Sequence, residues 1–120
     1  MQVKGIVWLG TRTDRFEDMV QFARDVLGLR QVLYKEDFAV FDLPNHDRLE
    51  IFGPSDVDHT FMTGPVAGFL VEDVETARTE LEEKGIQFIG PVHVDHGYSW
   101  SHFRAPDGHV YEISSRPVGK

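Results

Sequence analysis

Phe103-Arg-Ala-Pro-Asp-Gly-His-Val-Tyr-Glu-Ile113 is the stretch from which the fold of this chain can be worked out. Its ends are rich in residues that favour β-strands, and the Pro-Asp-Gly between them is typical of a tight turn. The second strand carries one carboxylate, Glu112. The stretch therefore predicts a hairpin with a single acidic side chain on its returning strand.

An earlier stretch, Phe41-Asp-Leu-Pro-Asn-His-Asp-Arg-Leu-Glu-Ile51, has the same layout. Its Phe, Pro, Glu and Ile match those of the later stretch at one constant offset. Such self-similarity indicates a duplicated structural unit, although two unrelated hairpins with similar turns would also produce it. We predict a single domain made of two modules, residues 1–55 and 64–120, joined by a connector, residues 53–65, that is rich in turn-forming residues.

Each half of the sequence follows the order strand, helix, strand, strand, strand. Asp14 and Asp73 are suited to begin the two helices, and a glycine follows each helix as a stop signal. The apolar stripe of the first helix is expected to run to Val26 and Leu27. The expected strands are residues 4–13, 29–35, 38–43 and 48–52 in the first half, and 66–71, 86–89, 100–104 and 110–114 in the second.

The second half contains an insertion around His93–Gly97, within a segment, residues 92–98, that we expect to be irregular. His93 and His96 have the spacing of a metal pair, but no helix fixes their geometry, so we interpret them as part of a mobile rim. His46, His59 and His109 fall in turns or in the connector and are expected to be solvated.

Composition excludes several classes of protein. The chain has 120 residues, no cysteine and a net charge of -8. Disulfides, thiolate metal sites and cysteine nucleophiles are therefore ruled out, and the negative charge argues against binding to nucleic acid. No apolar run reaches the length that spans a membrane, and no signal peptide is evident. We expect a cytoplasmic protein. The negative charge is compatible with a cationic ligand drawn in by long-range attraction, but most of the acidic residues fall on predicted helix faces and turns, where aiding solubility is the stronger explanation.

Each helix must bury its apolar side on one face of its sheet, which leaves the other face free. Two such sheets would enclose a cup that suits a small organic molecule. The sequence thus predicts an α+β fold with a cup-shaped mixed sheet.

Three segments carry a resemblance to a known family: Phe22-Ala-Arg-Asp-Val-Leu-Gly-Leu29, Val71-Glu-Asp-Val-Glu-Thr-Ala-Arg78 and the stretch quoted first. Together they resemble the vicinal oxygen chelate superfamily, which includes glyoxalases, bleomycin resistance proteins and extradiol dioxygenases. The resemblance implies two βαβββ modules and a homodimer. It also implies four metal-ligand positions, which fall on Trp8, Glu50, Val66 and Glu112.

Only two of these four residues can bind a metal, because Trp8 and Val66 offer no suitable donor. We therefore expect no cofactor and no tightly bound transition metal, since such a site would normally include imidazole. The alternative is a divalent ion held by Glu50, Glu112 and a displaced donor, His102.

Glu50 and Glu112 are the candidate catalytic residues, expected to face the cup as proton-transfer groups or anchors. The alternative is that each carboxylate is simply paired with an arginine, such as Arg12 or Arg48. His102 could be a proton shuttle, or merely a hydrogen-bonded strand histidine. The residues expected to contact a ligand are Trp8, Arg12, Phe52, Trp100, His102 and Arg104.

Two functions stay open from sequence. The first is a glyoxalase/bleomycin-resistance-type protein that binds a small molecule in the cup. The second is a divalent-metal-dependent lyase, isomerase or dioxygenase. Whether the protein is an enzyme is not decided by these residues.

Overall fold

The computed structural model describes residues 1–117 and contains two compact units. The first unit is Trp8–Val66, and the second combines Met1–Val7 with the chain from Ala67 onward. Each unit holds one sheet with its own helix, so the predicted α+β class and the βαβββ order of both halves are confirmed. Among the described residues, no helix is long and apolar enough to cross a bilayer.

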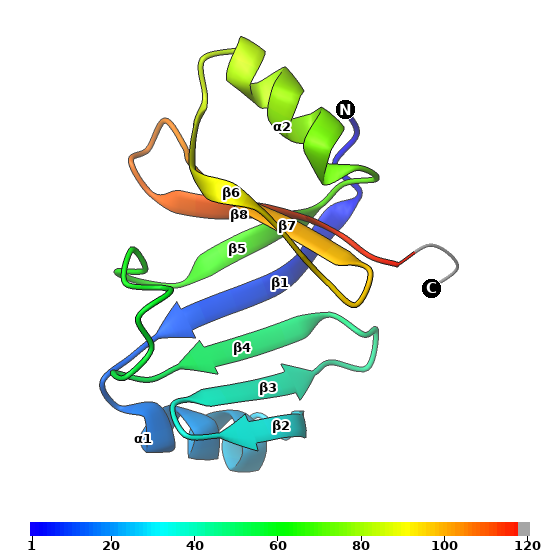
Figure 1. The fold of residues 1–120 in the computed structure, drawn as a ribbon. Coiled ribbons are helices and arrows are strands. Elements are labelled where there is room, and N and C mark those ends of the chain that lie inside the picture. The colour runs from blue at the N-terminus through cyan, green and yellow to red at the C-terminus, as the bar shows by residue number, and fades with distance from the viewer. Residues whose placement is uncertain (118–120) are drawn as a thin grey trace. The chain divides into compact units, whose positions relative to one another are not determined.

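The sheet of the first unit has the strand order β2-β3-β4-β1 (Figure 1). Strands β1 and β4 run parallel, whereas β3 is antiparallel to both β2 and β4. Its elements are β1 (Gly5–Arg12), α1 (Phe16–Gln21), a π-helical turn η1 (Phe22–Val26), β2 (Arg30–Lys35), β3 (Phe38–Asp42) and β4 (Arg48–Phe52).

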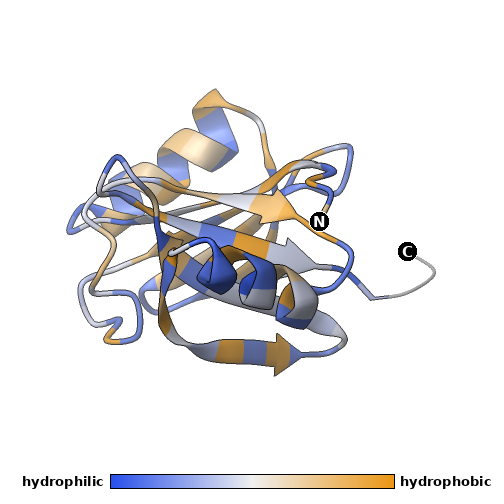
Figure 2. Ribbon diagram, turned by 90° about the horizontal axis from the view of Figure 1, so that it is seen from above, coloured by the Kyte–Doolittle hydropathy of each residue, from blue (hydrophilic) through white to orange (hydrophobic). Residues whose placement is uncertain are grey.

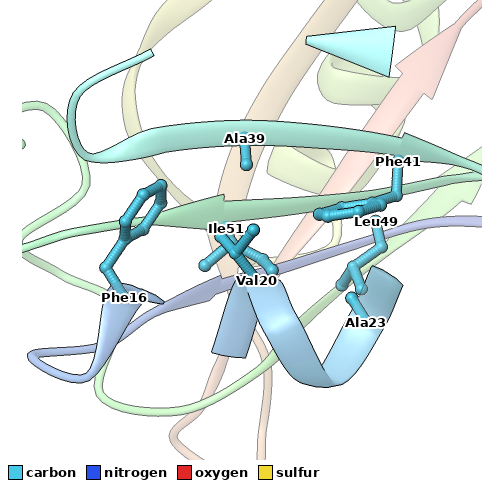
Figure 3. Packing of buried hydrophobic residues seen from close by; sticks show 7 residues of the cluster. All are labelled: Phe16, Val20, Ala23, Ala39, Phe41, Leu49 and Ile51. Carbon is cyan, nitrogen blue, oxygen red and sulfur yellow. The ribbon is translucent and has the colours of Figure 1, made fainter. Parts of the chain in front are cut away.

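The core of the first unit lies between the helical segment and one face of this sheet (Figure 3). Phe41 and Ile51 point from the sheet toward Val20 on α1, and each of the three is at most 2% exposed. Full burial of side chains of this size contributes about 1.5–3 kcal/mol each. The cluster comprises Phe16, Val20, Ala23, Ala39, Phe41, Leu49 and Ile51.

The first helix departs from the prediction at both ends. Arg15, not Asp14, is its N-cap residue, and no side chain caps it. At Phe22 the helix widens into η1, where Leu27 N–H donates to Phe22 O at 2.9 Å across five residues. This wider turn rotates the residues that follow off the apolar stripe. Val26 and Leu27, predicted to be core, are therefore 71% and 53% exposed.

The sheet of the second unit repeats this topology with the order β5-β8-β7-β6. Strands β5 and β8 run parallel, and β7 is antiparallel to both its neighbours. Asp73 is the N-cap residue of α2, as predicted, but its carboxylate accepts from the Thr76 hydroxyl instead of a helix N–H. Its elements are β5 (Val66–Leu70), α2 (Val74–Glu83), β6 (Gln87–Asp95), β7 (Tyr98–Arg104) and β8 (Val110–Ser115), and its core is Val71, Val74, Ala77, Phe103 and Ile113.

The duplication extends to individual hydrogen bonds in the two hairpin turns. Leu43 N donates to Asp47 O at 2.8 Å, and at the matching place Ala105 N donates to His109 O at 2.9 Å. In each turn the backbone N–H of the last residue also donates to the side chain two positions earlier, Asn45 in one and Asp107 in the other. The two hairpins thus share one turn geometry, in agreement with the repeated order and pairing of the strands in the two units.

Strand β6 corrects the expectation of an irregular segment at residues 92–98. The strand runs to Asp95 and turns through His96 and Gly97, which both have positive φ. Gly90 and Pro91 form a bulge instead of a stop, because the register with β7 shifts between Ile89 and His93. The predicted mobile rim is therefore a regular hairpin.

The bulge is held in place from the helix. Arg78 Nη1 donates to Gly90 O at 2.8 Å and to Ser101 Oγ at 3.2 Å, and its guanidinium lies 4.8 Å from the centre of the Phe88 ring. Arg78 thus ties α2 to β6 and to its neighbour β7.

Hydrophobic and hydrophilic residues alternate along several strands (Figure 2). With the helix covering one face of each sheet, the alternation sends a second set of side chains to the opposite face. We call this second surface the helix-free face of each unit. The candidate site residues lie there.

Candidate functional site

Glu50 lies on the helix-free face of the first unit. Its neighbours in sequence, Leu49 and Ile51, are buried in the core, and across the sheet Glu50 pairs with Gly10 on β1 and Val40 on β3. The carboxylate is half-buried. Of the two arginines considered as its partners, Arg48 pairs with Asp42 at 3.1 Å.

Trp8 shares this face with Glu50 and covers the position beside it. A Cβ added to Gly10 would lie only 2.1 Å from Cη2 of the Trp8 indole. The ring therefore lies directly over the Gly10 backbone, next to the strand that carries Glu50. A glycine at position 10 is what lets the tryptophan occupy this place.

Arg12 binds the connector. Its guanidinium donates to Pro54 O at 3.2 Å and to Asp56 O at 3.1 and 3.3 Å, and its Nε lies 3.7 Å from the Asp56 carboxylate. Arg12 was predicted to contact a ligand, and in the structure its guanidinium holds the chain that follows β4. The predicted ligand contact remains a prediction.

His59 corrects another expectation, because it is not a solvated connector residue. Its ring stacks on Phe52 with centroids 3.9 Å apart and an angle of 21° between the planes. Phe52 in turn stacks on Phe38 at 5.3 Å. His59 Nδ1 lies 3.0 Å from Asp56 Oδ1, and its side chain is only 22% exposed.

Sequence reasoning missed this cluster because it judged His59 by the composition of its surroundings. The available signal was the Asp56-x-x-His59 spacing, which lets an aspartate accept the backbone N–H three residues later, here at 3.0 Å. The spacing does not predict the stacking on Phe52, which depends on how the connector folds back over the sheet.

The second unit contains a buried carboxylate–imidazole pair. His102 Nε2 lies 3.1 Å from Glu112 Oε1, and the two side chains are 6% and 5% exposed. The two residues are register partners on β7 and β8, and Gly68 lies beside Glu112 on β5. The prediction that both face away from the helix is confirmed, because Phe103 and Ile113 next to them are in the core.

Burial governs the protonation of this imidazole. It lowers the pKa of His102 from 6.5 to about 4, because the imidazolium loses its hydration. His102 is therefore neutral at pH 7.

Trp100 and Arg104, the remaining residues of this unit predicted to contact a ligand, lie on the same strand as His102. Trp100 is two residues from His102 on β7 and stacks on His93 at 5.6 Å. Arg104 is exposed and donates to Gly108 O at 2.7 Å, within its own hairpin. His96 lies 2.7 Å from Asp95 at the exposed tip of the other hairpin, apart from the buried pair.

The donors present in each unit do not fit a transition-metal centre. The strand residues beside the two carboxylates are Gly10 and Gly68, which have no side chain to offer. In the second unit the available imidazole, His102, is already in contact with Glu112. Across residues 1–117, His, Asp and Glu side chains form no group of three or more with metal-binding geometry.

A surface hollow of about 670 Å³ lies elsewhere, at the start of α1 on the helix side of the first unit. Its lining is mainly acidic and includes Asp14, Glu17 and Asp37. The Tyr34 hydroxyl donates to Glu17 at 2.7 Å beside it. None of the predicted site residues lines this hollow.

The sequence model of the family described as Glyoxalase/Bleomycin resistance protein/Dioxygenase superfamily matches residues 5–113. No curated protein matches the sequence. Among solved structures, hypothetical protein BH1468 from Bacillus halodurans C-125 is similar with 18% identity and a TM-score of 0.72, over 97% of this chain and 96% of that one.

Two further similar structures are methylmalonyl-CoA epimerases. A variant of the Streptomyces coelicolor enzyme in complex with 2-nitronate-propionyl-CoA has 16% identity and a TM-score of 0.70, over 98% of this chain and 97% of that one. The Mycobacterium tuberculosis enzyme has 14% identity and a TM-score of 0.69, over 95% and 89%. At such low identity these likenesses concern the fold alone.

Proposed function

The chain belongs to the Glyoxalase/Bleomycin resistance protein/Dioxygenase superfamily, and from this premise we propose that it binds a small organic molecule, planar or cationic, on the helix-free faces of its sheets. The molecule is bound without a tightly held transition metal. Glu50 and Glu112 act as polar anchors, and aromatic side chains such as Trp8 and Trp100 provide the apolar contacts.

The observation that carries this proposal is the buried Glu112–His102 pair. A carboxylate with 5% of its side chain exposed is costly to bury unless charged or hydrogen-bonding groups offset the loss of water. Perturbed titratable groups of this kind gather at functional sites more often than elsewhere. With His102 neutral at pH 7, the carboxylate of Glu112 is the group of this pair that a ligand cation would complement.

The test uses benzamidinium, a planar cation, and benzamide, its neutral counterpart of the same shape. Binding is followed by NMR titration of the folded protein. We expect benzamidinium to bind the wild type about tenfold or more tightly than benzamide, since hydrogen bonds to charged groups contribute about 1.5–3 kcal/mol. Glu112→Gln should remove this preference, and the exposed helix variant Glu83→Gln should keep it. Equal binding of the two compounds by the wild type would contradict the proposal.

Metal content of the dialysed protein decides between this function and the alternative. Less than a tenth of an equivalent of divalent metal is expected, with benzamidinium binding unchanged by chelator. Near-stoichiometric metal that disappears in Glu112→Gln would instead favour a metal-dependent lyase, isomerase or dioxygenase. The homodimer is likewise a proposal, and light scattering of the purified protein tests it.

A further inference from the structure

We propose that residues 54–62 of the connector form a closed lid on the helix-free face of the first unit, held by Arg12, and that a ligand reaches Glu50 only when this lid opens. The inference rests on the proposed function, because it concerns access to one of the two faces that are proposed to bind the small molecule. It also gives a reason why Arg12 and Phe52, both predicted to contact a ligand, contact the connector instead.

The first support is burial on a side of the sheet that has no helix. Val40 and Phe52 are only 4% and 5% exposed. Both side chains point away from the helix, because their strand neighbours Ala39, Phe41 and Ile51 are in the helix-side core. An open binding face would leave such side chains in contact with water. Part of this face is therefore covered by the chain itself.

The second support is that the connector supplies part of this cover. The His59 ring stacks on Phe52 with centroids 3.9 Å apart. Met62, three residues further along, is also buried and belongs to neither of the helix-side cores. A linker that only joined the two modules would have no need to bury side chains of this kind. Residues 54–62 thus pack as a cover and not as a loose connection.

The third support is the way in which the cover is held. Arg12 lies beside Phe52 in the register of β1 and β4, and its guanidinium donates to the backbone carbonyls of Pro54 and Asp56. The Asp56 carboxylate in turn accepts the backbone N–H of His59 at 3.0 Å and lies 3.0 Å from its Nδ1. The contacts therefore run from Arg12 through Asp56 to the ring that covers Phe52. Arg12 is a positioning residue that acts through Asp56.

The fourth support is that such a cover can open without unfolding the sheet. Residues 54–62 belong to no helix or strand, and segments of this kind open at a lower free-energy cost than core strands. Opening would uncover the ring of Phe52, which is two residues from Glu50 on the same face. A face that is open for only a fraction of the time binds its ligand more weakly by that fraction. Loosening the lid should therefore tighten ligand binding at this face.

The two tryptophans report the two faces separately, because Trp8 lies in the first unit and Trp100 in the second. We expect NMR titration of Arg12→Gln, followed at the indole N–H of Trp8, to give about tenfold tighter binding than the wild type. Benzamide and benzamidinium should gain equally, since a lost positive charge alone would favour only the cation. Binding at Trp100 should not change. Arg15→Gln, which removes the same charge from an exposed helix position, should leave both signals at wild-type affinity.

Amide hydrogen exchange tests the lid directly. The backbone N–H groups of Asp56 and Met62 donate to Gly53 O and His59 O within the connector. In the ligand-free protein they should exchange about tenfold faster in Arg12→Gln. Saturating benzamidinium should also speed their exchange in the wild type, because a ligand that binds the open form increases its population. Unchanged affinity at Trp8 in the variant, or slower exchange with the ligand bound, would overturn the inference.

The two proposals fail in different ways. If benzamidinium is preferred at Trp100 through Glu112 while Arg12→Gln leaves binding at Trp8 unchanged, only the inference about the lid is wrong. If neither indole signal responds to benzamidinium in the wild type or in Arg12→Gln, both proposals are wrong.

Discussion

Lowering the pH should weaken the fold through a single buried imidazole, His102. Burial holds its pKa at about 4 in the folded protein, below the 6.5 of an exposed histidine. The unfolded chain therefore binds a proton at His102 at a higher pH than the folded chain does. The stability that follows is fully present above about pH 6.5 and is lost as the pH falls toward 4.

The size of the effect follows from the two pKa values of His102. Each tenfold difference in proton affinity corresponds to about 1.4 kcal/mol. Because burial lowers the pKa of His102 from 6.5 to about 4, full protonation should lower the free energy of unfolding by about 3 kcal/mol. A domain of this size is typically stable by about 5–15 kcal/mol. One histidine thus controls a substantial share of the unfolding free energy in mildly acidic solution.

Urea denaturation at intervals between pH 7 and pH 4 measures this effect. Other acidic groups also titrate in the range, so the informative quantity is the stability of the wild type minus that of His102→Gln at each pH. We expect this difference to fall by about 3 kcal/mol between pH 7 and pH 4. A difference that does not change, or that rises on acidification because Glu112 holds a charged His102, would refute the reasoning.

Three further sets of substitutions test the packing and the backbone conformation of the turns. Gly10→Ala would bring a Cβ within 2.1 Å of the Trp8 ring, so we expect urea denaturation to show that the free energy of unfolding falls by about 1–3 kcal/mol. In a Trp8→Ala background, the same Gly10→Ala change should lower the free energy of unfolding by less. Arg78→Ala should lower the free energy of unfolding by about 1–3 kcal/mol and speed amide hydrogen exchange in β6. Arg78→Lys should have the same two effects, because an ammonium group lacks the planar set of donors of a guanidinium. His46→Gly should raise the melting temperature, because φ is 70° there, whereas Gly108→Ala at 84° in the duplicate turn should lower it. Equal shifts of one sign would contradict this last pair.

The sequence was most informative where structure depends on nearby residues. The two hairpin turns were predicted from Pro, Asn, Asp and Gly within a few positions of one another, and β4 (Arg48–Phe52) was predicted to the residue. Alternation along β8 likewise placed Glu112 opposite the core. These features follow from turn chemistry and strand periodicity, which are properties of a short stretch.

Features that depend on distant residues could not be predicted in this way. The bulge of β6 is held by Arg78, which donates to a backbone carbonyl of this strand from α2. The stacking of His59 on Phe52 depends on how the connector folds, and the pairing of His102 with Glu112 depends on the register between two strands. The apolar periodicity of residues 16–27 predicts a continuous α-helix and does not reveal that α1 ends in a π-helical turn.

The assignment of Met1–Val7 to the second unit bears on how the chain could be cut. Lys4 N–H donates to Leu70 O at 2.8 Å, and the amino terminus pairs with Glu80 at 2.9 Å. A protease nick near Gly64 would therefore leave an N-terminal fragment that carries seven residues belonging to the other unit. The two fragments should stay bound to each other after cleavage. Once separated, each fragment should fold completely only when the other is added back.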